Sequence, residues 1–360
     1  YNDNRGGYID NVAGTFQASH LVNGTFPGET VTYAAGHKFY NGTVVGAGGL
    51  TVPVQKKIVD NTSTVEDDFN DAHYAGARLG LKWAINDNWD LLIQNTQQSL
   101  KTEGVWDYDI AKGDLKVSRF TPDKLDDSFS STAWTLNGSV GDIDLVYTGA
   151  YLDRSVEAQL DYTGYTNIGA FISGYQCEYL TGGYYFGSYT KGTQYTWDPT
   201  LSGNPGVIEC GNPANAVALD NEMTRMTNEL RFSTNWDGMV NMQGGVYVED
   251  FEIKHIGDFN YLAPYEAGWG PININSASKF DNTAANARGV ITAATQFRND
   301  NLRTEKQTAL FGEIDFQLSD ELNVAIGARK YDLDYDFQGY GAWRYGNRPL
   351  LVDDNDPTND

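Results

Sequence analysis

The sequence predicts an all-β fold, the wall of an antiparallel transmembrane β-barrel, and three observations support this prediction. Runs of alternating apolar and polar residues come in pairs that are joined by turns of two or three residues. Long polar stretches separate these pairs, and aromatic residues stand beside the short turns. Short periplasmic turns at one end and long extracellular loops at the other are typical of outer-membrane barrels.

Four hairpins carry this pattern along the chain. In each hairpin two alternating runs flank a turn that is rich in Asp, Asn or Gly, the residues that tight turns favour. The predicted strand pairs are 77–85 with 89–97, 131–140 with 143–154, 229–236 with 240–253, and 308–318 with 322–337.

The two faces of these strands differ in chemistry. One face is apolar, whereas the other carries mid-strand charges such as Arg78, Arg231 and Glu313, which a water-filled lumen tolerates. We therefore expect the apolar side chains to face the membrane and the aromatic residues beside the turns to form an interfacial girdle. The expected membrane-facing residues are Leu79, Leu136, Leu230 and Ile314, and the expected girdle residues are Trp83, Trp89, Trp236 and Phe316.

Two of the long strands change phase partway along. After Val248 and after Lys330 the apolar residues move from even to odd positions. A β-bulge near the outer rim would keep the apolar side chains on the outward face. The alternative is that strand pairing loosens above the membrane. With a bulge, three acidic residues of the last strand face the lumen: Asp332, Asp334 and Asp336.

Composition excludes several classes of protein. The chain has 360 residues, a formal net charge of -23 and a mean hydropathy of -0.47. No apolar run is long enough for a membrane-spanning helix, which needs about 20 residues. The negative charge makes nucleic acid an unsuitable partner.

The sequence predicts no enzyme, no metal site and no cofactor. The four histidines, His20, His37, His73 and His255, are scattered without metal-ligand spacing. The glycine-rich stretch 46–49 lacks the lysine that follows in a phosphate-binding loop.

Both cysteines lie in one long loop. A disulfide between Cys177 and Cys210 is favoured because the outer end of a barrel faces an oxidising compartment. Such a bond would contribute roughly 3 kcal/mol in the chain-entropy model. The alternative is a pair of unbonded, buried thiols.

Aromatic residues in two loops are candidates for ligand contact. Large amphipathic rings bind ligands at low entropic cost, although such rings also pack a loop onto itself. The candidates are Tyr184, Tyr185, Tyr189 and Trp197 in the first loop and Tyr261, Tyr265 and Trp269 in the second.

Several segments resemble the TonB-dependent outer-membrane receptors. Residues 6–11 (GGYIDN) resemble the family's GYIDN, and residues 66–83 (EDDFNDAHYAGARLGLKW) resemble its ND…YGGRAALRW strand. Residues 227–233 (TNELRFS) are similar to EELRLTS, and residues 307–313 (QTALFGE) to YALFGE. Residues 322–332 (LNVAIGARKYD) are similar to LTLGLRYD. The order and spacing of these segments make the resemblance more specific than any single match.

The resemblance implies that residues 1–360 are part of a 22-stranded barrel, without the plug domain and the closing strands. It implies an outer-membrane protein of a Gram-negative bacterium that imports a scarce, bulky nutrient such as a ferric siderophore. Its partners would be outer-membrane lipid, the small-molecule nutrient and, through the plug domain, TonB. The alternatives are a passive porin or oligosaccharide channel and, less favoured, a secreted β-rich binding module.

Overall fold

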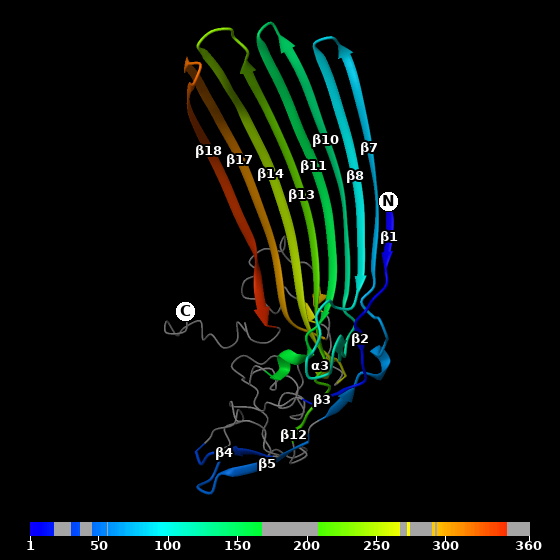
Figure 1. Cartoon of the computed structure of the whole chain (residues 1–360). Coiled ribbons are helices and arrows are strands. Elements are labelled where there is room, and N and C mark those ends of the chain that lie inside the picture. The colour runs from blue at the N-terminus through cyan, green and yellow to red at the C-terminus, as the bar shows by residue number, and fades with distance from the viewer. Residues whose placement is uncertain are drawn as a thin grey trace.

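The computed structural model describes residues 1–17, 30–36, 45–55, 57–167, 208–266, 272–273, 290–291 and 294–343. Its main feature is a nine-stranded antiparallel sheet that forms a tall, curved wall (Figure 1). The strand order is β1-β7-β8-β10-β11-β13-β14-β17-β18. The strands are β1 (Asn2–Arg5), β7 (Ala72–Asn86), β8 (Trp89–Glu103), β10 (Lys124–Val140), β11 (Ile143–Asp161), β13 (Asn215–Thr234), β14 (Val240–Tyr261), β17 (Thr295–Ser319) and β18 (Leu322–Trp343).

All four predicted hairpins are present. Their short turns lie together at one end of the wall, and the described parts of the long connections lie at the other end (Figure 1). The strands are longer than predicted, and β17 reaches 25 residues. Because 9–11 residues suffice to cross a bilayer, even the 15-residue strands β7 and β8 exceed that length, and β17 is more than twice as long. The all-β antiparallel fold is therefore confirmed.

Smaller elements gather at the loop end of the wall (Figure 1). Among the described residues no helix is long and apolar enough to cross a bilayer. The small strands are β2 (Asp10–Asn11), β3 (Thr15–Gln17), β4 (Thr30–Tyr33), β5 (Leu50–Gln55), β6 (Ile58–Asp60), β9 (Lys116–Val117), β12 (Ile208–Glu209), β15 (Ile272–Asn273) and β16 (Val290–Ile291). The helical turns are η1 (Thr62–Thr64), η2 (Thr163–Asn167) and α3 (Leu262–Glu266).

Strand register divides the half of the wall near the short turns into two faces, because residues directly opposite each other share a face. One cross-strand row on the apolar face joins Leu136, Tyr147, Leu230, Val246 and Leu310. On this face no Asp, Glu, Lys or Arg occurs in β8 residues 89–99, β10 residues 128–140 or β13 residues 224–234. The same holds for β11 residues 143–151, β14 residues 240–248, β17 residues 308–318 and β18 residues 322–328. We call this region the apolar band.

The apolar band is open to its surroundings. Leu79 is 75% exposed, and Leu230 and Ile314 are 48% and 39% exposed. Leu136 lies on the same face and is half-buried. These side chains share one face of the sheet, as predicted, and do not meet in a closed core. The predicted girdle residues Trp83 and Trp236 are likewise exposed beside the short turns.

No β-bulge accompanies either phase change. β14 pairs with β17 without a register shift from Val240 to Phe259, and a shift follows only at Asn260, well past Val248. β17 pairs with β18 continuously from Phe297 to Gln317, a stretch that includes the partners of Lys330 and the residues after it. The apolar residues after the phase change therefore lie on the opposite, polar face of the sheet. Three acidic residues lie on the same face as the apolar band rather than on the polar face, which corrects the prediction: Asp332, Asp334 and Asp336.

Buried asparagines fasten the small elements to the loop end of the wall. The Asn70 carboxamide accepts hydrogen bonds from the backbone N–H groups of Tyr8 and Ile9, each at 2.7 Å. Asn61 accepts a bond from the N–H of Gly14 and donates to the carbonyl of Val12. Such side chains replace the regular hydrogen bonds that irregular segments lack. These hydrogen bonds hold the irregular segments 8–14, 61–66 and 116–121 together at the loop end, and we call them the platform.

Some glycines of the sheet leave the space that an aromatic ring on the neighbouring strand occupies. Gly138 pairs with Trp89 across the β8–β10 contact, and a Cβ atom at Gly138 would lie 2.2 Å from Cε3 of the Trp89 ring. We expect Gly138→Val to displace this ring and to lower the free energy of unfolding by about 1–3 kcal/mol. Urea unfolding in lipid vesicles, followed by tryptophan fluorescence, measures the change. Gly80→Val is the matched control, because a Cβ there has only ordinary contacts at 3.8 Å or more.

Asp123, next to the start of β10, should make stability depend on pH. Its side chain is buried, and burial raises the pKa of this carboxyl group despite the Arg119 guanidinium 3.6 Å away. The folded state then holds the proton more tightly than the unfolded state. Stability should therefore fall as the pH rises from the ordinary aspartate range of about 3.9 through the raised pKa. Urea unfolding at a series of pH values should show this fall in the wild type and a weaker one in Asp123→Asn.

Candidate functional site

Three arginines and four aromatic rings form a connected group on the polar face of the sheet. They lie on adjacent strands, β13, β14, β17 and β18, and all occupy odd-numbered positions of the registered sheet. We call this group the arginine–aromatic panel; it consists of Arg225, Arg303, Arg329, Tyr247, Phe251, Phe311 and Tyr335.

Phe251 is the centre of one half of the panel. The guanidinium carbons of Arg225 and Arg303 lie 5.2 and 6.0 Å from the centroid of its ring. Glu249 holds Arg225 through a 2.6 Å ion pair and accepts a 2.7 Å hydrogen bond from the Tyr247 hydroxyl. This carboxylate is largely buried, whereas the Arg225 side chain is 50% exposed. Glu249 thus holds the Arg225 guanidinium in place, while half of the arginine side chain stays exposed and can contact a ligand.

The other two arginines also rest on rings. Arg303 forms an ion pair with Glu305 and lies 5.2 Å from the Tyr335 ring centroid. Arg329 lies 5.6 Å from the Tyr247 ring and 6.0 Å from the Phe311 ring. Within the described part of the chain Arg329 has no ion pair. The contacts described for its guanidinium are with ring faces, so it is the most available cation of the panel.

Exposed apolar side chains continue the panel along β18. They lie on the polar face because no bulge returns them to the other side. Their exposed fractions range from 51% to 61%, and they are Tyr331, Leu333, Tyr335 and Phe337. Arginine donates planar, paired hydrogen bonds to carboxylate or phosphate groups and stacks on rings. Chemically, the panel is suited to a bulky anionic ligand with aromatic or apolar parts.

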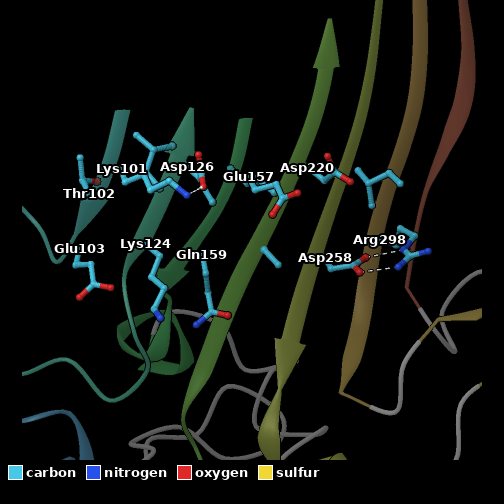
Figure 2. A pocket seen from close by; sticks show the side chains of 15 residues that line it. Lys101, Thr102, Glu103, Lys124, Asp126, Glu157, Gln159, Asp220, Asp258 and Arg298 are labelled. Atoms are coloured by element: carbon cyan, nitrogen blue, oxygen red, sulfur yellow. Dashed lines mark hydrogen bonds and ion pairs between the residues drawn. The ribbon is translucent and has the colours of Figure 1, made fainter. Parts of the chain in front are cut away.

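A hollow lies on the same face as the apolar band, beyond its charge-free part (Figure 2). It has a volume of about 730 Å³. An ion pair stands on either side: Lys101 with Asp126 at 2.6 Å, and Arg298 with Asp258 through two contacts of 2.6 Å. Glu157 and Asp220 lie between these pairs (Figure 2). These charges mark where the apolar band ends, since a charged row cannot face hydrocarbon cheaply.

The predicted ligand-binding aromatics are not brought together by the described structure. Tyr184, Tyr185, Tyr189, Trp197 and Trp269 lie outside the described residues. Tyr265 belongs to α3, and Tyr261 ends β14 with its side chain fully buried at 0% exposure. Ligand contact by these loops stays a prediction.

The predicted disulfide is not tested by the described residues. Cys177 lies outside them, and no described cysteine is a free thiol. Among the described side chains no group of three His, Cys, Asp or Glu is arranged to hold a metal ion.

Sequence patterns alone did not identify the arginine–aromatic panel. Its members are far apart in the chain and meet only through strand register. The phase change was the feature of the sequence that could have indicated the panel, since Phe251 and Tyr335 lie in the stretches that follow the two phase changes. An uninterrupted register predicts that apolar residues after a phase change face the opposite side.

Comparison with known proteins gives a similarity in structure but none in sequence. No protein-family model and no curated protein matches the sequence. The fold is similar to the crystal structure of the ferric yersiniabactin uptake receptor FyuA from Yersinia pestis, with 12% sequence identity and a TM-score of 0.45. The similarity covers 83% of this chain and 40% of that chain, so this chain spans less than half of the receptor's length.

Proposed function

We propose that this chain is part of the wall of an outer-membrane receptor that imports a scarce, bulky nutrient. The apolar band is the observation that carries the proposal. In the same length of strand the opposite face carries Arg78, Lys82, Arg231 and Glu313. One face therefore suits hydrocarbon and the other suits water, as in a transmembrane β-barrel.

The nutrient is a ferric siderophore or a similar metal complex in this proposal. The arginine–aromatic panel supports this class, because it offers guanidinium groups and rings to a bulky anion on the face that would line the lumen. Import would require energy delivered by TonB through a plug domain. The protein would reside in the outer membrane of a Gram-negative bacterium.

Uptake by the full-length protein tests the proposal. Cells that carry it should accumulate iron-55 from a ferric catecholate or ferric hydroxamate, and the accumulation should stop when TonB is deleted. A large, constantly open conductance in planar bilayers, together with TonB-independent uptake, would instead identify a passive porin.

Arg329 gives a sharper test of the panel. We expect Arg329→Gln to weaken binding of the anionic ferric complex about tenfold, the equivalent of about 1.4 kcal/mol, because a cation over two rings is lost. Quenching of intrinsic tryptophan fluorescence by the complex measures the affinity. Arg78→Gln removes a cation from the same face at β7, far from the panel in strand order, and should leave affinity unchanged. Equal losses in both variants would contradict a role for the panel.

A further inference from the structure

A hollow of about 610 Å³ interrupts the apolar band between β13 and β18. Its floor is one cross-strand row in which Gly244 is opposite Gly312 and Gly312 is opposite Ala328. Phe232 closes this row at the β13 end. The Phe232 ring covers Gly244, whereas Gly312 and Ala328 are exposed, so the floor of the hollow is open at these two positions.

Two parallel rows of large apolar side chains wall the hollow. They are Leu230, Val246 and Leu310 on the loop side and Met242, Ile314 and Ile326 on the turn side. On β14 and on β17 the two walls are four residues apart, about 14 Å at 3.4 Å per residue. One hydrocarbon chain fits between the walls when its carbon atoms lie about 3.5–4.0 Å from the carbon atoms of each wall. A helix with side chains is about 10–12 Å wide and does not fit.

Packing within the protein does not require the glycine at position 312. A Cβ atom there would meet only the carbonyl oxygen of Gln243, at an ordinary 3.5 Å. At Gly244, in contrast, a Cβ atom would lie 3.0 Å from the Phe311 carbonyl oxygen and 3.1 Å from the Phe232 ring. Glycine in a strand weakens it, so the open space at Gly312 has no internal structural cause.

The hollow lies on the turn side of the apolar band. Gly244 is four residues from the start of β14, about 14 Å along a strand that would be tilted in the membrane. This depth is less than half of a hydrocarbon core of about 30 Å. The surrounding leaflet would be the periplasmic one, which follows from the proposed orientation of the short turns.

We propose that this hollow binds one acyl chain of a phospholipid from the periplasmic leaflet. The inference rests on the proposed membrane location. Every side chain that points into the hollow is apolar, and its walls are continuous with the band that would contact lipid. A flexible acyl chain can fill a narrow trough that is bounded on both sides, whereas a protein helix would contact only the tops of the two walls and leave the trough empty.

Photo-crosslinking tests the proposal on the full-length protein. The protein is reconstituted in phosphatidylcholine vesicles that contain a phosphatidylcholine with a diazirine on one acyl chain, and the crosslinks are mapped by mass spectrometry. We expect labelling to concentrate on Val246, Leu310 and Ile326. Gly312→Leu should reduce it roughly threefold or more, because the chain loses several carbon contacts. Gly312→Ala, a milder change, should reduce it less.

Thr308→Leu is the matched control, because it adds similar bulk to an exposed position of the same strand and face outside the hollow. It should leave the labelling of the hollow unchanged. Labelling spread evenly over the apolar band, or insensitive to Gly312→Leu, would overturn the acyl-chain site while leaving the membrane location intact. Labelling absent from the whole band would overturn the membrane location itself.

Discussion

Ile314→Arg should destabilise the protein in a bilayer by about 2–4 kcal/mol. Ile314 lies near the middle of the apolar band on β17 and is 39% exposed, so its replacement would face hydrocarbon rather than a protein core. An arginine on the lipid face near the bilayer midplane has this cost in transmembrane barrels. Urea unfolding of the full-length protein in phosphatidylcholine vesicles measures the difference directly.

Glu313→Arg provides the contrast on the same strand. Glu313 lies on the opposite face and accepts a 2.7 Å hydrogen bond from Gln243. Its replacement by arginine introduces the same side chain into a face that would be wet, and should cost less than about 1 kcal/mol. Similar costs for the two variants would contradict the assignment of the two faces.

Asn11→Ala should loosen the platform at the loop end. The Asn11 side chain is 2% exposed. It donates to the carbonyl oxygens of Thr64 and Arg119 at 2.6 and 3.2 Å and accepts from the Arg119 N–H at 2.7 Å. Alanine would leave the Thr64 carbonyl and the Arg119 N–H without this partner, at about 1–3 kcal/mol for each unsatisfied group, whereas the Arg119 carbonyl keeps its bonds from Asn61 and Thr64. We expect a local loss of about 3 kcal/mol or more.

Hydrogen exchange resolves this local effect. Amide exchange should accelerate in residues 8–14, 61–66 and 116–121 of the Asn11→Ala variant, because these segments share the asparagine network. The exchange of mid-strand amides in β10 and β11 should not change. Asn88→Ala, in an exposed short turn, is the control and should leave the platform protected. Unchanged exchange in both variants would show that the network contributes little.

The hairpins could be predicted because their signals are local. Alternation with period two and turns such as 141–142 determine both strand pairing and face. The exposed apolar side chains at Leu79 and Leu230 follow from the same pattern. The strands are longer than predicted because the alternation weakens beyond the apolar band, where both faces carry charged residues.

The site was harder to predict because it depends on register over several strands. Whether Tyr335 points to one face or the other is decided by the absence of a bulge in the β17–β18 pairing. A bulge and a continuous ladder are both compatible with the same residues. Likewise, the buried position of Asn11 depends on segments more than 100 residues away in sequence, such as Arg119.

A spin-label scan along β17 tests the central claim, the division of the wall into a lipid-facing and a water-facing side. Single cysteines at positions 307–316 of the full-length protein, with Cys177 and Cys210 replaced by serine, would carry a nitroxide in phosphatidylcholine vesicles. Even positions, including Leu310 and Ile314, should collide with oxygen, and odd positions, including Phe311 and Glu313, with a water-soluble nickel complex. Loss of this alternation, or even positions protected from both reagents as in a protein core, would contradict the account.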